Sequence, residues 1–145
     1  MEQLLALNKS DVIIIFNDEL TTFLSELLKI FTQLKSNKET TNQLLNYKNL
    51  IESGISANVE TGVEMFAGYI FSEGNDDFCQ RISNKDYNFF YKLEESIDKS
   101  NKFSEVIMLI KNLFIQLNDT NKESIFGYLE NLCTLANVYA IKKMK

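Results

Sequence analysis

The chain has no proline among its 145 residues, and this absence limits its possible folds more than any motif does. Average usage of about 5% would place roughly seven prolines in a chain of this length. Proline removes a backbone donor and clashes with the preceding helical turn, so its absence spares helices their commonest breaker. Long, uninterrupted helices are therefore open to this chain wherever its apolar pattern supports them.

The first apolar pattern runs from Ile13 to Leu34 in steps of three and four residues, which predicts one long amphipathic helix. Ser10 or Asp11 is expected to cap it. The alternative is a short β-strand over residues 12–16, because four of the five residues in VIIIF are β-branched. We favour the helix, since the pattern keeps its phase beyond residue 16 and a lone strand would lack a partner.

A capping box, SNKE at residues 36–39, predicts the start of a second helix. Gly54 is expected to end this helix. Asn58 is then expected to cap a third helix, which Gly74 closes. The apolar positions of the third helix follow in steps of four, three and four: Val59, Val63, Phe66 and Ile70.

Two glycines, Gly62 and Gly68, fall inside the predicted third helix. Glycine in a helix interior costs about 1 kcal/mol relative to alanine. Their expected use is to let another helix approach closely.

The C-terminal part of the chain carries two further helical patterns. Residues 103–117 are apolar over much of the helix circumference, which predicts the central and most buried helix. A second capping box, TNKE at residues 120–123, predicts the start of the final helix. Its apolar positions step four, three, four and three residues: Ile125, Leu129, Leu132, Ala136 and Tyr139.

These patterns together predict an all-α fold. We expect one domain over residues 1–145, built as a bundle of five or six helices joined by loops of about two to eight residues. Residues 1–9 are expected to be loosely ordered. At this length folding removes roughly two-thirds of the unfolded surface from water, which is enough for a genuine core.

The net charge and the scarcity of arginine and histidine exclude several classes of function. The formal net charge is −5, and the chain has a single arginine. A protein that binds a phosphate backbone needs clustered basic residues, so we expect no direct nucleic-acid partner. The chain has no histidine, which excludes histidine-dependent catalytic triads and histidine-ligated zinc within it. No catalytic, cofactor-binding or metal-binding residue is predicted.

The two cysteines, Cys79 and Cys133, lie 54 positions apart and form no CxxC pair. They cannot make a four-thiolate zinc site. We expect two reduced, partly buried thiols, because free cysteine is among the most buried residue types, and a disulfide is the alternative.

The N-terminal stretch has an acidic residue directly after Met1 and carries Asp11 within its apolar part, unlike a signal peptide. Its longest apolar run, VIIIF, is far shorter than the roughly twenty residues that span a bilayer. We therefore expect an intracellular protein without membrane insertion.

Residues 75–92, NDDFCQRISNKDYNFFYK, bring together acids, a cysteine, the single arginine and several aromatics. Glu73, Asp76 and Asp77 group carboxylates beside Gly74, but their spacing does not match a calcium-binding loop. We expect structural corners instead, in which Asn75 or Asp76 caps one short helix and Asn84 or Asp86 caps the next.

The aromatics of this segment are expected to anchor the two halves of the bundle, with Phe89, Phe90 and Leu93 buried. Tyrosine combines an apolar face with a polar tip and is common at interfaces. The residues predicted to form an interaction surface are Phe78, Tyr87, Phe90 and Tyr91.

Four sequence segments, taken in their order along the chain, are similar to segments of a known group of proteins: YIFSEG at 69–74, DDF at 76–78, NKDYNFF at 84–90, and IKNLFIQLNDTNKESIFGYLENLCTLANVYA at 110–140. The chain resembles small helical proteins of unknown function encoded by large DNA viruses of algae and protists. The resemblance implies a virus-encoded protein in a host cytoplasm or a virion, and it implies no catalytic residues.

The function expected from these features is a non-enzymatic protein–protein interaction protein, part of a virion or of a virus-made assembly. Its partners are expected to be viral or host proteins, and a homo-oligomer is left open. The alternative is a host-directed helical adaptor with a groove for a partner helix, as in viral cell-death inhibitors.

Overall fold

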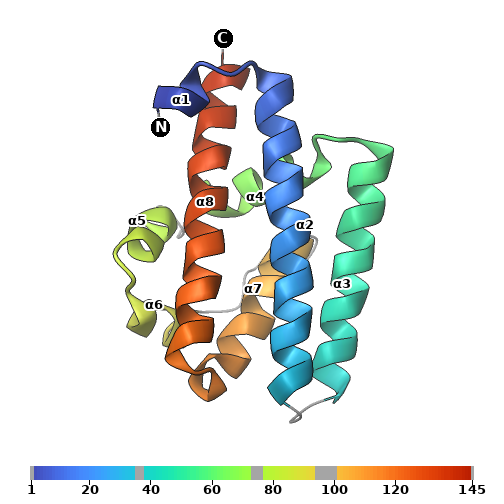
Figure 1. Cartoon of the computed structure of the whole chain (residues 1–145), viewed down its shortest axis with the longest axis vertical. Helices are drawn as coiled ribbons and strands as arrows, with labels where there is room; N and C mark the ends of the chain where they lie inside the picture. Colours follow the sequence, from blue (N-terminus) through green and yellow to red (C-terminus); the bar gives the residue numbers. More distant parts are fainter. Residues whose placement is uncertain (1, 35–37, 73–76, 94–100, 145) are drawn as a thin grey trace.

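The computed structural model describes residues 2–34, 38–72, 77–93 and 101–144. The long N-terminal pattern folds as one helix, α2, over Lys9–Leu34 (Figure 1). Nine of its side chains are buried, among them Val12 and Phe16. The helix expected over residues 12–16 is thereby confirmed. The expected cap is wrong, because Asn8 Oδ1 accepts a hydrogen bond from the N–H of Asp11 at 2.8 Å and the helix begins at Lys9.

The described residues form helices and no β-strand, so the predicted all-α class is confirmed. Five helices have ten or more residues, and three others are short. The remaining helices are α1 (Glu2–Leu5), α3 (Lys38–Ala57), α4 (Thr61–Ile70), α5 (Phe78–Ser83), α6 (Tyr87–Tyr91), α7 (Lys102–Leu113), the 3-10 turn η1 (Phe114–Gln116) and α8 (Asp119–Lys143).

Helices α2 and α8 form the centre of the bundle and run antiparallel to one another (Figure 1). The rings of Phe23 and Tyr128 lie 5.4 Å apart, and Asn131 Nδ2 donates to Glu19 Oε1 at 3.1 Å. Helix α3 packs on α2, α5 packs on α8, and α4 and α7 complete the bundle. The buried side chains of these helices join in one hydrophobic core. No helix in the described part of the chain is both long and apolar enough to cross a membrane.

The helix predicted over 103–117 is divided, and it is not the centre of the fold. Helix α7 ends at Leu113, and η1 then turns the chain towards α8. Seven of the twelve residues of α7 are buried, but α2 and α8 occupy the central position. Asn101 caps α7 by accepting hydrogen bonds from the N–H groups of Phe103 and Ser104.

Two of the expected helix boundaries are wrong. Helix α3 continues through Gly54 to Ala57, and α8 begins before the TNKE box because Asn118 Oδ1 accepts from the N–H of Asn121 at 2.8 Å. The expected cap of α4 is wrong too, because the helix begins at Thr61 after Glu60, and Asn58 Oδ1 accepts from the N–H of Glu60 at 3.0 Å in the turn before it. Val59, expected as the first apolar position of this helix, lies before it and is 59% exposed. Ser36, Gly74, Asn75 and Asp76, for which caps or ends were expected, lie outside the described residues.

Loose order was expected for residues 1–9; of these, residues 2–8 form α1 and the turn into α2, and Lys9 begins α2. Leu4 and Leu7 pack against the core, and Lys142 Nζ donates to the backbone carbonyl of Leu5. The first residues are therefore held against the last turns of α8.

Of the two glycines in α4, only Gly62 serves a close approach. A Cβ atom there would lie 3.1 Å from Asn17 Oδ1, Leu20 Cδ2 and Ile55 Cδ1, so α2 and the end of α3 press directly on it. At Gly68 the nearest atom would be 3.8 Å away, which is ordinary contact. The expected role is thus confirmed at one position and wrong at the other.

Gly127→Ala should raise the free energy of unfolding by about 0.5–1 kcal/mol, because alanine is the better helix former. Gly127 lies in the interior of α8, and a Cβ there would meet no atom within 4 Å. Denaturant unfolding followed by circular dichroism measures the change. Gly62→Ala is the matched control and should show no such gain. A Gly127→Ala protein no more stable than the parent would contradict this placement.

Candidate interaction surface

Two of the four predicted surface residues, Phe78 and Phe90, are fully buried and cannot touch a partner. Phe90 stacks on Phe114 with ring centroids 5.0 Å apart and rings inclined by 17°. Phe78 packs edge-on against Tyr69 at 5.2 Å. The prediction fails because α5 and α6 rest on α8 and η1 and turn these phenylalanines inward. Their role is the anchoring one that was expected for Phe90.

The two tyrosines lie at the surface, where the sequence pattern placed them. Tyr91 is 41% exposed and Tyr87 is partly buried. Both rings contact Phe114, with centroids 5.6 and 5.7 Å away. Lys122 Nζ lies 5.3 Å from the Phe114 centroid and 6.0 Å from each tyrosine centroid, and it donates to Tyr91 Oη at 3.3 Å. This cation–π arrangement orients both tyrosines from α8.

Ile115 is the residue that the sequence reasoning missed. It is 76% exposed, although it follows the fully buried Phe114 in η1. The signal was present, because position 115 falls between the apolar steps at 113–114 and 117 and should face outward. We call the group of Tyr87, Tyr91, Ile115 and Lys122 the α6–η1 corner.

The single arginine holds the short helices that carry this corner. Arg81 Nε donates to Asp77 Oδ2, and Arg81 Nη1 donates to Asp86 Oδ2, both at 2.7 Å. Asp86 Oδ1 also accepts from the N–H of Phe89, so the same carboxylate caps α6. The hydrogen bond from Arg81 lowers the pKa of Asp77. Arg81 therefore fixes the turn between α5 and α6.

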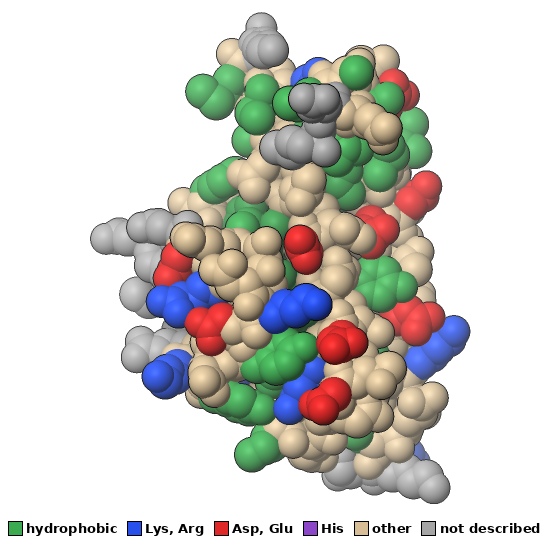
Figure 2. Space-filling model, turned by 60° about the vertical axis from the view of Figure 1, so that its left-hand side comes forward, with side chains coloured by type: hydrophobic (Ala, Val, Ile, Leu, Met, Phe, Trp, Pro, Cys, Tyr) green, Lys and Arg blue, Asp and Glu red, His purple; other side chains and the backbone are tan. Residues whose placement is uncertain are grey.

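Figure 2 shows this side of the molecule, where hydrophobic side chains lie among basic side chains (Lys and Arg) and acidic ones (Asp and Glu). A mixed surround of this kind does not form the basic stripe that nucleic acid requires. It is typical of the rim around a protein–protein contact, where polar groups surround apolar anchors.

A second group of exposed apolar residues lies where α1, the start of α2 and the end of α8 meet (Figure 1). Their exposed fractions range from 37% at Leu5 to 88% at Met144. We call this group the apolar end; it comprises Leu5, Ile14, Ile15, Ile141 and Met144. Unlike the α6–η1 corner, it has no aromatic side chain.

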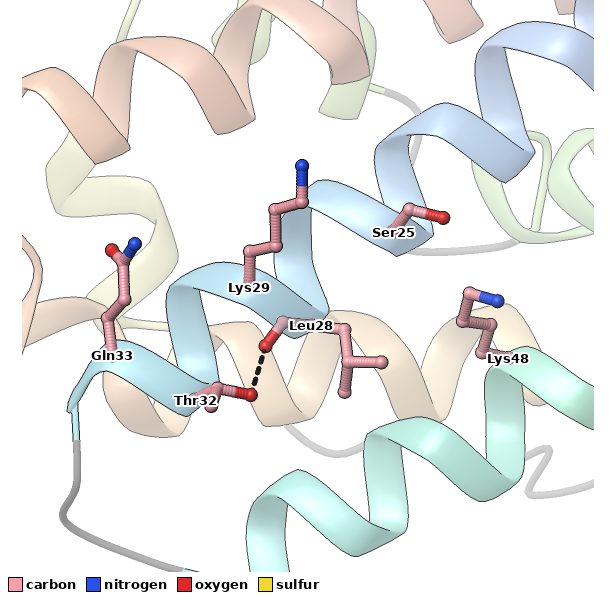
Figure 3. Close-up of a pocket in the computed structure, with 6 residues that line it drawn as sticks. All are labelled: Ser25, Leu28, Lys29, Thr32, Gln33 and Lys48. Atoms are coloured by element: carbon pink, nitrogen blue, oxygen red, sulfur yellow. Dashed lines mark hydrogen bonds between the residues drawn. The ribbon is translucent and has the colours of Figure 1, made fainter.

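A hollow of about 490 Å³ lies between α2 and α3 (Figure 3). Leu28 is the one apolar side chain among the six described residues that line it: Ser25, Leu28, Lys29, Thr32, Gln33 and Lys48. Thr32 Oγ1 donates to the Leu28 carbonyl at 2.7 Å, and Lys48 pairs with Glu52 at 2.9 Å. The hollow thus offers one apolar contact within a polar rim.

Two carboxylates lie close to Tyr139, whose Oη is 2.8 Å from Glu60 Oε2 and 2.6 Å from Glu64 Oε1. Burial and the two glutamates raise the pKa of Tyr139. Hydrogen bonds from Lys143 and Tyr139 lower the pKa of Glu64. At neutral pH the tyrosine therefore keeps its proton and Glu64 stays charged. These contacts hold α4 against α8. Lys9 Nζ adds an ion pair with Glu60 at 3.7 Å.

Both cysteines are free thiols, as expected; Cys133 is buried and Cys79 is partly exposed. The described residues contain no group of three or more side chains able to hold a metal ion. Glu73 and Asp76, two of the acids considered for a cation, lie outside those residues.

The chain was also compared with known proteins. No family model, no curated protein and no solved structure matches it.

Proposed function

We propose that this chain is a non-enzymatic protein–protein interaction protein that docks a partner through the α6–η1 corner. The observation that carries the proposal is an exposed tyrosine, Tyr91, whose ring packs on the buried Phe114, next to which in the chain stands the exposed Ile115. Phe114 belongs to a buried cluster with Phe90 and Phe126, in which the ring centroids lie 5.0–5.9 Å apart. Anchors held on a rigid base lose little freedom on binding, which favours affinity.

The charge of the corner supports a protein partner. Lys122 is turned towards the aromatic rings, and Arg81 is engaged by Asp77 and Asp86. These two cations are thus already engaged by groups of the chain itself, whereas Tyr91 and Ile115 offer the contact area that interface centres use.

The resemblance to helical proteins of large DNA viruses supports the wider context: a virus-encoded protein that is part of a virion or of a virus-made assembly. Mass spectrometry of purified particles of the encoding virus should then find the chain in stoichiometric amount. Recovery only as a free monomer from infected cells would contradict this part of the proposal.

The test of the docking surface uses the full chain as bait in lysate of infected cells, with bound proteins identified by mass spectrometry. The double variant Tyr91→Ala with Ile115→Ser should reduce partner recovery at least tenfold, because truncated anchors each cost on the order of 1–2 kcal/mol. The matched control is Ile14→Ser with Ile141→Ser on the apolar end, which should bind as the parent does. Equal recovery by the parent and the corner variant would refute docking at this corner. Sedimentation of the purified chain shows whether the bound partner is a second copy.

The second candidate is a host-directed adaptor that binds a helix in the hollow between α2 and α3. An amphipathic helix places several apolar side chains, at i, i+3, i+4 and i+7, into its groove. Leu28 supplies one apolar contact there, so the geometry supports this candidate less well than the corner. Leu28→Asp tests this candidate in the same experiment. If Leu28→Asp loses the partner and the corner variant keeps it, the partner binds in the hollow.

A further inference from the structure

The ammonium group of Lys122 lies over three aromatic rings at once. Its Nζ atom is 5.3 Å from the ring centroid of Phe114 and 6.0 Å from the centroids of both Tyr87 and Tyr91. All three distances are in the range of a cation–π contact. We call the rings of Tyr87, Tyr91 and Phe114 the aromatic cage. Since one ammonium group already occupies it, the cage has the size and the ring orientation that a cation needs.

The lysine in the cage is held by the rings and by one hydroxyl group. Lys122 Nζ donates to Tyr91 Oη at 3.3 Å, and within the described residues it pairs with no carboxylate. Lys9 and Lys143 also lie over a ring, that of Tyr139, but each of them is paired with a glutamate as well. The lysine of the cage is therefore the one of these three that can leave its ring without breaking an ion pair.

The cage is open to solvent. Tyr91 is 41% exposed, and Tyr87 and Lys122 are partly exposed, while Phe114 at the base is fully buried. The lysine side chain is a flexible stem of four carbons, so its ammonium group can turn outward into water at little cost. A second cation can then reach the same position from outside.

We propose that the α6–η1 corner binds a lysine or arginine side chain of its protein partner, which replaces the ammonium group of Lys122 in the aromatic cage. This inference rests on the proposed docking function and states the chemistry of the partner. The exposed Ile115, which follows Phe114 in the chain, offers an apolar contact for the hydrocarbon stem of the incoming side chain.

The charge beside the cage favours a cation over an anion. Asp119 and Glu123 are exposed and lie one turn apart on the same face of α8, and Asp119 stands three positions before Lys122. Neither carboxylate belongs to an ion pair in the part of the chain that the structure describes. They complement an incoming lysine or arginine and repel an acidic side chain. The net charge of the chain, −5, acts in the same direction.

The first test measures cation binding without a partner. The full chain with Lys122→Ala, which empties the cage, is titrated with choline, and the proton NMR signal of the choline N-methyl groups is followed. A neutral analogue of choline, in which a tert-butyl group replaces the trimethylammonium group, should bind at least about tenfold more weakly, because the rings attract the positive charge. The parent chain should bind choline at least about threefold more weakly than Lys122→Ala, since Lys122 competes for the cage.

Two control variants locate the binding. Lys29→Ala changes the net charge by the same amount as Lys122→Ala but leaves the cage filled, so it should bind choline as weakly as the parent does. Tyr91→Ala combined with Lys122→Ala removes one ring and should weaken choline binding at least about threefold relative to Lys122→Ala alone. Lys122→Gln gives an independent measurement of the emptied cage if circular dichroism shows that Lys122→Ala disturbs the fold.

The second test uses the variants as bait in lysate of infected cells. Lys122→Ala should recover about threefold more of the protein that the parent recovers, because the internal competitor is gone. Lys122→Arg places a cation in the cage again and should recover as much as the parent. Excess choline should displace the bound protein from Lys122→Ala, and the neutral analogue should not.

Equal binding of choline and its neutral analogue to Lys122→Ala would overturn the cage as a cation site. Choline binding without a gain in partner recovery would overturn the partner's cation as its occupant. Failure of the docking function is recognised separately, by equal recovery with the parent and with Tyr91→Ala plus Ile115→Ser, because the choline titration needs no partner.

Discussion

Phe90→Ala should lower the free energy of unfolding by about 3–5 kcal/mol, whereas Tyr91→Ala, one position along, should cost about 1 kcal/mol or less. Phe90 is fully buried and its ring centroid lies 5.0 Å from that of Phe114 and 5.3 Å from that of Phe126. Truncation there removes three ring contacts, including one with Phe89 at 5.6 Å, and leaves a cavity. Tyr91 is 41% exposed, so water can replace most of what it loses.

Denaturant unfolding of both variants, followed by far-ultraviolet circular dichroism, measures the two changes. Tyr91→Ala is the matched control for Phe90→Ala, because both residues belong to the same five-residue helix, α6. Equal losses of stability, or a larger loss for Tyr91→Ala, would mean that α6 does not present these faces. The result also bears on docking, since only a variant that keeps the fold can report on partner contact.

Ser25→Pro should destabilise the protein by about 3 kcal/mol or more. Ser25 is an exposed residue near the middle of α2, so its replacement loses little side-chain packing. Proline there removes a helix hydrogen bond and clashes with the carbonyl one turn earlier, which bends the helix. A bend in α2 disturbs its packing on α8, α3 and α4 at once.

Two controls separate the backbone effect from the side-chain effect. Ser25→Ala should change stability by less than about 0.5 kcal/mol. Asp119→Pro should be tolerated within about 1 kcal/mol, because residue 119 is the first residue of α8 and Asn118 before it is extended, with φ −77° and ψ 169°. Thermal unfolding and denaturant midpoints give these values. A Ser25→Pro protein as stable as Ser25→Ala would show that α2 tolerates interruption.

The long helices could be predicted because their apolar spacing repeats over several turns. In α8 all five predicted positions, from Ile125 to Tyr139, are buried. Boundaries were harder to predict, since Asn, Ser and Asp cap helices about equally well. Near α2 the choice among Asn8, Ser10 and Asp11 therefore could not be made from the sequence alone, and the structure uses Asn8.

The candidate site could be predicted only in part. Helices α5 and α6 have six and five residues, too few turns for an apolar stripe to show which side faces inward. The inward side is set by Phe114 and Phe126, which lie far along the chain from Phe90. This is why Phe90 was expected both in the core and on the surface, and why Tyr87 and Tyr91 were easier to place.

The pairing of α2 with α8 has a consequence for how the protein is made. The two helices are separated by most of the chain, so α2 leaves the ribosome long before its main partner is synthesised. During that interval its nine inward-facing apolar side chains lack the surface that covers them in the finished bundle. Pairing of segments so distant in the sequence also slows folding relative to a bundle of neighbouring helices. We therefore expect a dependence on chaperones during translation that the finished, compact protein no longer has.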